Sequence, residues 1–280
     1  MTMNKIIVPT DFTTTADVAV SYAIMLSKTL KAEVCLLHIL GKGGDAAKAQ
    51  KSLDDQIHHH YVKTAVKPVS KLITGSIFDE IATVVEEEKG DLVVMGTHGM
   101  KGMQHLVGSH ALRVITDTKA PFVIVQDGTV VKPQIKRIVL PLDLHKETKQ
   151  KIKYVGDMAE KFNAKIDIVI PNESDEYLQN QVKRNLAYAK DYFDERKIQH
   201  TGSVTSRDSK HFVEDLTEYA VKVSADMICI LNFADEKLIH AFGSDAEQKL
   251  ITNSASIPVM VLNPVTVNLH NTRSLIAQWG

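Results

Sequence analysis

Asp91-Leu92-Val93-Val94-Met95-Gly96-Thr97-His98-Gly99-Met100-Lys101-Gly102 is a short apolar run that leads directly into a glycine-rich loop. The run predicts a buried parallel strand. Gly108-Ser109 follows, and residues 110–118 predict a helix with Ser109 as its cap. Glycines between the carboxyl end of a strand and the start of a helix let backbone N–H groups approach phosphate oxygens. The stretch therefore favours an α/β fold with an anion-binding loop, and an ordinary glycine turn is the alternative.

The chain contains an internal repeat. Four segments recur in the same order at offsets of 132 to 137 residues: residues 6–11, 91–95, 108–109 and 120–125 return as 138–143, 226–230, 243–244 and 257–262. Four matches in one order at one spacing indicate a duplicated domain. We expect domains at 1–127 and 136–264, joined by a polar linker, and a C-terminal tail at 265–280.

Strands and helices alternate within each half. In the first half we expect strands at 5–9, 33–39, 67–73, 91–95 and 121–125, with helices at 14–30, 47–63, 77–89 and 108–118. This alternation predicts two tandem Rossmann-like domains, each a five-stranded parallel sheet with helices on both faces. Ligands bind such sheets beyond the carboxyl ends of the strands, where strand order reverses. Asp11, His38-Ile39 and the Gly96 loop lie at the carboxyl ends of the first, second and fourth strands, so we expect them to converge.

Composition narrows the class of protein. The 280 residues carry a formal net charge of −1 and are 44% hydrophobic, which argues against a general nucleic-acid or anionic-membrane binder. No apolar run reaches membrane-spanning length, and the strand-like segment Lys5-Ile6-Ile7-Val8 leads us to expect no cleavable leader. Cys35 and Cys229 lie in expected strands and are predicted to be buried free thiols. We expect a cytoplasmic protein.

Two local patterns have simple structural readings. His58-His59-His60 looks like a metal cluster, but consecutive helical residues point about 100° apart, so we expect a solvated helix surface. Gly75-Ser76 followed by Asp79 predicts a turn and a capping box for the third helix.

Several motifs together resemble the universal stress protein family. They are Pro9-Thr10-Asp11-Phe12, Leu37-His38-Ile39, Val94-Met95-Gly96-Thr97-His98-Gly99, Gly108-Ser109 and Ala120-Pro121-Phe122-Val123-Ile124-Val125. The resemblance runs through the whole chain and implies a tandem protein of two such domains. It further implies that the domains pair about a pseudo-two-fold axis through their last strands, at 121–125 and 257–262.

The resemblance also implies a ligand, because one branch of the family binds ATP through a G-x2-G-x9-G-(S/T) loop. By this likeness Asp11 lies near the nucleoside and backbone groups of Ile39 contact adenine. The phosphates are held by the amides of Gly96, Gly99 and Gly108 and by the Ser109 hydroxyl. The remaining candidate contacts are Pro9, Thr10, Met95 and His98, and Asp11 could assist Mg²⁺ beside a triphosphate.

This sequence departs from the binding pattern in two places. Eight residues separate Gly99 from Gly108, where the pattern has nine. In the second half, Leu231-Asn232-Phe233-Ala234 replaces the glycines, so its backbone cannot easily take positive φ angles or approach a phosphate. We interpret the second half as a degenerate copy that binds no nucleotide in the ATP manner and holds a different ligand or serves as a structural partner.

Two functions remain open. The first is a cytosolic adenine-nucleotide-binding module of the stress response, with its site in the N-terminal half and at most slow ATP hydrolysis. The second is a nucleotide-independent scaffold or regulator that acts through protein contacts. No P-loop lysine, dinucleotide glycine motif or catalytic pair supports a dedicated enzyme. The sequence leaves open which proteins are partners and whether two chains form a homodimer.

Overall fold

The computed structural model of the chain describes residues 3–97, 114–115, 118–142, 148–232 and 244–263. His98, Gly99, Gly108 and Ser109 lie outside these residues, as does the tail at 265–280. Within the described part, no helix has both the length and the apolar composition needed to cross a membrane.

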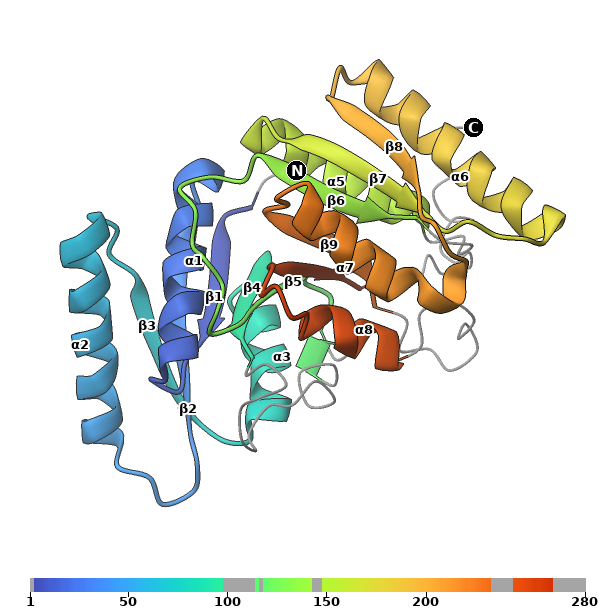
Figure 1. Ribbon diagram of the computed structural model, residues 1–280. Coiled ribbons are helices and arrows are strands. Elements are labelled where there is room, and N and C mark those ends of the chain that lie inside the picture. Colours follow the sequence, from blue (N-terminus) through green and yellow to red (C-terminus); the bar gives the residue numbers. More distant parts are fainter. Residues whose placement is uncertain (1–2, 98–113, 116–117, 143–147, 233–243, 264–280) are drawn as a thin grey trace, which may run out of the picture.

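The strands form one ten-stranded sheet in the order β3-β2-β1-β4-β5-β10-β9-β6-β7-β8 (Figure 1). The strands of the first half are β1 (Lys5–Pro9), β2 (Glu33–Leu40), β3 (Val69–Thr74), β4 (Leu92–Gly96) and β5 (Phe122–Val125). Those of the second half are β6 (Arg137–Pro141), β7 (Lys165–Ile170), β8 (His200–Val204), β9 (Met227–Leu231) and β10 (Val259–Leu262). Pairs within each half are parallel, which confirms the predicted fold.

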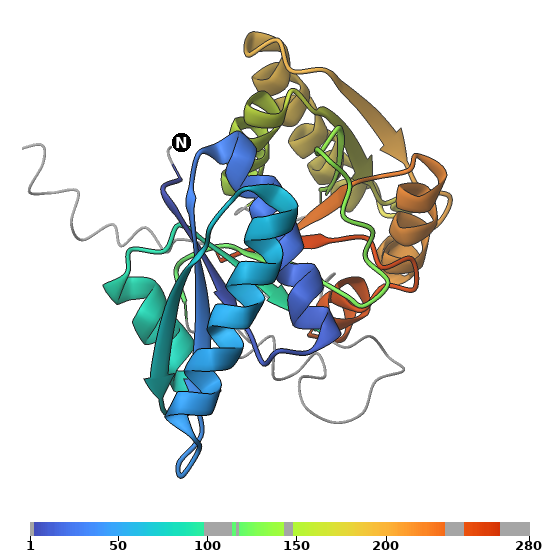
Figure 2. The same cartoon turned by 90° about the vertical axis from the view of Figure 1, so that its left-hand side faces the viewer.

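Helices cover both faces of the sheet. The first half contributes α1 (Thr14–Leu30), α2 (Ala46–Thr64) and α3 (Ile77–Glu87). The second half contributes α5 (Thr148–Phe162), α6 (Glu176–Glu195), the short 3₁₀ helix η1 (Ser209–His211), α7 (Phe212–Lys222) and α8 (Ser244–Ile251). Right-handed crossovers place α1 and α2 on one face of the first half and α3 on the other (Figure 2).

The helices α1 and α5 end in the same backbone conformation in the two halves. Each helix is followed by a residue in the left-handed conformation, Lys31 with φ of 57° and Asn163 with φ of 51°. These residues are 132 positions apart, the offset of the first repeated segment. A left-handed residue after a helix satisfies the last carbonyl groups of the final turn. The helix register is therefore the same in both copies.

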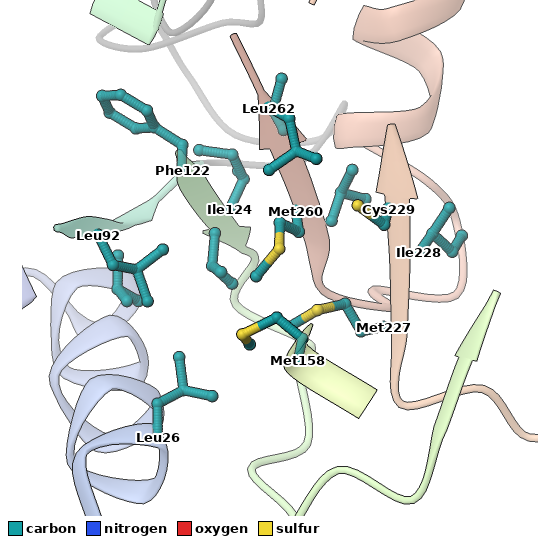
Figure 3. Close-up of a cluster of buried hydrophobic side chains, with 14 of the residues drawn as sticks. Leu26, Leu92, Phe122, Ile124, Met158, Met227, Ile228, Cys229, Met260 and Leu262 are labelled. Atoms are coloured by element: carbon teal, nitrogen blue, oxygen red, sulfur yellow. The ribbon is translucent and has the colours of Figure 1, made fainter. Parts of the chain in front are cut away.

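The halves join through their last strands. β5 and β10 pair antiparallel, with Val123 opposite Met260. Figure 3 shows the buried side chains at this junction, where Leu26 of α1 and Met158 of α5 approach the strand residues from the helical side. Each strand covers the edge that the other would expose to solvent. The predicted junction is confirmed, and the reversed strand order of the second half is that of a pseudo-two-fold arrangement.

The helical start at Ser76 differs from the expected capping box. Ser76 is the N-cap residue of α3, but its side chain makes no capping hydrogen bond. Asp79 instead lies in the first turn, where its charge is favourable next to the positive end of the helix dipole. The pattern predicted the start of the helix correctly and its hydrogen bond wrongly.

Candidate functional site

A hollow that is open to solvent lies at the carboxyl ends of β1, β2 and β4. This is the point where strand order reverses, because β1 lies between β2 and β4. Its described lining includes six residues expected from the sequence: Pro9, Thr10, Asp11, Ile39, Met95 and Gly96. Three strands that are distant in sequence therefore bring these residues to one place, as open α/β sheets do at their switch points.

The loop between β1 and α1 is held by its own side chains. Asp11 Oδ1 accepts hydrogen bonds from the backbone N–H of Thr13 at 3.1 Å and from its hydroxyl at 2.6 Å. The Thr13 oxygen in turn accepts from the N–H of Ala16 and caps α1. Asp11 Oδ2 accepts no hydrogen bond from the residues that the structure describes. The loop thus presents one carboxylate oxygen of an exposed aspartate at the rim of the hollow.

His38 lines the side of the hollow, and Phe12 packs against its ring. Phe12 has a φ of 65°, an unusual conformation for a bulky residue, and its ring lies 4.4 Å from the His38 ring between centroids. His38 Nδ1 is 2.8 Å from the carbonyl oxygen of Thr10. A carbonyl only accepts, so Nδ1 carries the proton, and Nε2 of the neutral ring is an acceptor. The imidazole of His38, held by Phe12 and the Thr10 carbonyl group, thus offers the hollow a ring face and an acceptor nitrogen.

A chain of hydrogen-bonded polar side chains lies behind Thr10; it is buried at Gln56 and His60 and half-exposed at Asp17. The Thr10 hydroxyl donates to Gln56 Oε1 at 3.0 Å, and Gln56 Nε2 donates to Asp17 Oδ1 at 2.6 Å. His60 Nε2 lies 3.3 Å from the same Asp17 oxygen. The sequence analysis did not identify Gln56 or Asp17, because a single Gln or Asp in a helix forms no pattern that marks a buried hydrogen-bond network.

His60 corrects an expectation from the sequence. Its side chain is 3% exposed and belongs to the buried chain, whereas His58 and His59 are exposed. Burial lowers the pKa of His60, and the nearby Asp17 opposes that shift only in part. The prediction of a solvated helix surface was therefore wrong for His60, one of the three histidines. Successive helical residues point in different directions, so one of them can face the core while its neighbours face solvent.

Gly96 fits its position because it has no side chain. A Cβ at this residue would lie 2.8 Å from the carbonyl oxygen of Thr15. Thr15 lines the hollow, and its hydroxyl hydrogen-bonds to the carboxylate of Asp127 at the start of the linker. Asp127 was not expected near the site, and the duplication pattern gave no signal for this contact. The close packing of β4 on α1 sets the floor of the hollow.

The second half has a different arrangement at the equivalent strand end. Lys151 of α5 stands where α1 has Ala19, and it is 1% exposed. Its Nζ donates to the carbonyl oxygen of Pro141 at 2.5 Å, at the carboxyl end of β6. Pro9, the counterpart of Pro141, lines the hollow of the first half. A buried lysine is rare and needs a bonded partner, so this strand end is built around the lysine.

No group of three or more His, Cys, Asp or Glu residues that could hold a metal ion is present in the part of the chain that the structure describes. The structure describes the glycine loop only as far as Thr97, so most of the expected phosphate contacts lie outside the described residues. Among the described residues, the hollow is mainly apolar, with Leu37, Ile39, Ile77 and Met95 around the polar Asp11 rim. Such a surface suits a flat, partly polar ring more than an extended anion.

Together the duplicated parallel sheet and the switch-point hollow define a tandem Rossmann-like α/β protein. The sequence pattern of the Universal stress protein family matches residues 2–126. A universal stress protein of Methanocaldococcus jannaschii, MJ0531, is 30% identical over 138 residues, which span 44% of this chain and 81% of that protein. This chain belongs to the universal stress protein family.

Solved structures match the fold of both halves together. A universal stress protein from Archaeoglobus fulgidus superposes with a TM-score of 0.72 at 16% identity, covering 94% of this chain and 97% of the other. A protein from Pseudomonas aeruginosa described as a putative universal stress protein superposes with a TM-score of 0.63 at 15% identity, covering 94% of each chain. At these identities the similarity shows the fold, including its tandem layout.

Proposed function

We propose that the protein is a cytoplasmic stress-response module that binds an adenine nucleotide, ATP, in the hollow of its first half. The proposed domains span residues 1–127 and 136–264. The nucleotide acts as a ligand that biases conformation or the choice of protein partner, not as the substrate of a fast reaction. The second domain serves as a structural partner.

The gathering of residues from β1, β2 and β4 around one hollow is the observation that carries this proposal. In the proposed complex, adenine lies against the wall of Ile39 and His38, with Nε2 of His38 accepting from an amino group. Asp11 accepts from the nucleoside at the rim, and Pro9, Thr10 and Met95 shape the hollow. Gly96, His98, Gly99, Gly108 and Ser109 are the proposed phosphate contacts, with Mg²⁺ beside them.

A nucleotide-independent scaffold of the same fold is the second candidate. Only eight residues separate Gly99 from Gly108, one fewer than in the binding pattern, and one residue spans up to roughly 3.5 Å of chain. A shift of that size would separate amide donors from phosphate oxygens. In this case the protein acts through its protein contacts alone.

Isothermal titration of the full chain with ATP, AMP and GTP, with and without Mg²⁺, separates the candidates. We expect binding near one equivalent per chain with preference for adenine. Two equivalents would show that the second half also binds. No binding at millimolar nucleotide would refute the proposed site and leave the scaffold.

Asp11→Asn tests the position of the site. The variant keeps Oδ1 for the bonds to Thr13 and loses the charge, so we expect ATP to bind about 5-fold more weakly, the difference between a charged and a neutral hydrogen bond. Asp45→Asn is the matched control, because Asp45 is likewise an exposed aspartate whose Oδ1 accepts from a backbone N–H at the start of a helix, but it is absent from the described lining of the hollow. Equal losses in both variants would place the nucleotide elsewhere.

A further inference from the structure

The side chains that line the hollow of the first half use their O–H and N–H groups within the protein. In the described lining, the side chains with such a group are Thr10, Thr13, Thr15 and His38. The hydroxyl of Thr10 donates to Gln56 Oε1 at 3.0 Å. The hydroxyl of Thr13 donates to Asp11 Oδ1 at 2.6 Å. A hydroxyl has a single proton to donate, so neither threonine can donate to a ligand.

The other two donor groups are used in the same way. The Thr15 hydroxyl donates to the carboxylate of Asp127, which can only accept. The Nδ1–H of His38 donates to the carbonyl oxygen of Thr10 at 2.8 Å. The side chains of the described lining therefore offer a ligand acceptors and no donor.

The acceptor atom of His38 can be reached from solvent. Nε2 makes no hydrogen bond with the described residues, yet it is not among their buried side-chain atoms that lack a partner. His38 itself is half-buried and lines the hollow. Asp11, whose Oδ2 is the other acceptor, lies at the exposed rim. Nε2 is therefore the acceptor nearer to the apolar part of the hollow, where a ring would lie.

Its surroundings fix the imidazole of His38 in this role. The Phe12 ring packs against it with 4.4 Å between centroids and 31° between planes. A ring turned over would take Nδ1 away from Thr10 and leave that carbonyl group without its donor. Because a carbonyl group never donates, the neutral ring keeps its proton on Nδ1 and its lone pair on Nε2.

The second half shows that the fold does not need a histidine at this place. Leu37 pairs with Pro9 in the first half, and Val169 pairs with Pro141 in the second, so the residue after each of them is equivalent. That residue is His38 in β2 and an isoleucine, 3% exposed, in β7. Both strands end alike, which leaves the imidazole available for a role in the hollow.

We infer that His38 is the specificity-determining residue of the hollow and selects a purine that carries an amino group over one that carries a carbonyl group at the same ring position. The inference rests on the proposed nucleotide site and adds base selectivity to it. The two groups are almost equal in size, so apolar contacts with Ile39 and Met95 distinguish them little. An amino group donates to Nε2, whereas a carbonyl oxygen would face its lone pair, and both acceptors would lose water without gaining a bond.

ATP and ITP test the inference by calorimetry on the full chain, because ITP has hypoxanthine in place of adenine and the same ribose and phosphates. We expect ATP to bind about 10-fold more tightly than ITP or better, the effect of one lost hydrogen bond and an unpaired acceptor. In His38→Gln the preference should fall to within roughly 2-fold, since an amide can turn either its donor or its acceptor to the base. His58→Gln is the matched control and should keep the preference, because His58 is exposed and absent from the described lining of the hollow.

NMR of the full chain with ¹⁵N-labelled histidine rings keeps the test valid if His38→Gln proves unstable. We expect His38 to carry its proton on Nδ1 in the free chain, and its Nε2 signal to shift on addition of ATP. A proton on Nε2, or an Nε2 signal that ignores saturating ATP, would overturn the inference.

The calorimetric outcomes separate the inference from the proposed function. Equal affinities for ATP and ITP, in a chain that binds ATP, would overturn the selectivity by His38 and leave the nucleotide site standing. No binding of ATP would overturn both. Loss of the preference in His58→Gln as well as in His38→Gln would place the base away from His38.

Discussion

Gln126 and Asn263 hold equivalent positions and make reciprocal contacts across the junction. Each is the residue that directly follows the last strand of its half. Gln126 Nε2 donates to the carbonyl oxygen of Asn253, in the turn before β10, at 3.1 Å. Asn263 Nδ2 donates to the carbonyl oxygens of Ile115 at 2.6 Å and Thr118 at 2.7 Å, before β5. The two-fold relation therefore extends from the strands to individual side chains.

Asn263→Ala should destabilise the protein. The substitution removes the donor for the Ile115 and Thr118 carbonyl groups and also the acceptor at 2.8 Å for Asn232 Nδ2. Unsatisfied groups of this kind cost about 1–3 kcal/mol, and we expect a loss in that range in the free energy of unfolding by urea. Gln126→Ala removes one bond, so its loss should be smaller.

Gln199→Ala is the control for both changes, since Gln199 is exposed and precedes an edge strand. Its effect should stay within about 0.5 kcal/mol. A change at Asn263 no larger than this control would show that the amide contributes little to the junction.

The fold could be predicted from the sequence because its signals are repeated and local. The apolar run at residues 92–95 and its copy at 227–230 each mark a buried strand, and the structure has β4 and β9 there. The pairing of β5 with β10 was also expected, but only because the resemblance to the family implied a junction through the last strands. The hydrogen bonds at helix ends were harder to predict, as Ser76 shows, because a capping bond depends on a side-chain rotamer that the sequence does not specify.

The candidate site was predictable only as far as the strand ends. Asp11, Ile39 and Gly96 follow directly from where their strands stop, and all three line the hollow. Gln56 and Asp127 contact the site residues Thr10 and Thr15 from other elements. Such tertiary contacts leave no periodic pattern in one sequence. Lys151 was missed for a related reason, because a lysine in a helix is normally exposed.

Gln56→Ala should loosen the loop that carries Asp11. Gln56 joins the Thr10 hydroxyl to Asp17, and its removal leaves the buried hydroxyl of Thr10 without its acceptor. We expect a loss of about 1–3 kcal/mol in chemical denaturation. Gln50→Ala is the matched control on the same helix, because Gln50 bonds only to the exposed Asp54 among the described residues. Similar effects of the two substitutions would show that the buried chain does not hold the loop.

Cys35 and Cys229 should resist alkylation in the folded protein. Burial raises the pKa of Cys35 to about 11 and that of Cys229 to about 12, while the reactive species is the thiolate. At pH 8 both thiols should react with iodoacetamide only after unfolding by guanidinium, as followed by mass spectrometry of the two cysteine peptides. Fast labelling of either cysteine without denaturant would show that its strand opens readily.

His60 should make the protein less stable in mild acid. Burial lowers its pKa below the unfolded value of about 6.5, so the unfolded chain binds the proton more tightly. Its stabilising contribution is therefore complete above that unfolded pKa and is lost as pH falls through the folded pKa. Asp17 limits this loss by favouring the charged ring, whereas His59 and Lys63 add to it.

His60→Asn tests this expectation through the slope of stability against pH. Urea unfolding of the parent chain between pH 7.5 and 5.5 should show a falling free energy of unfolding, and the variant should fall less steeply. His58→Asn is the matched control and should keep the slope of the parent, since His58 is exposed on the same helix and is not part of the buried chain. If His60→Asn and His58→Asn gave the same slope as the parent chain, protonation of His60 would not be coupled to folding, and the buried chain behind Thr10 would tolerate the charge.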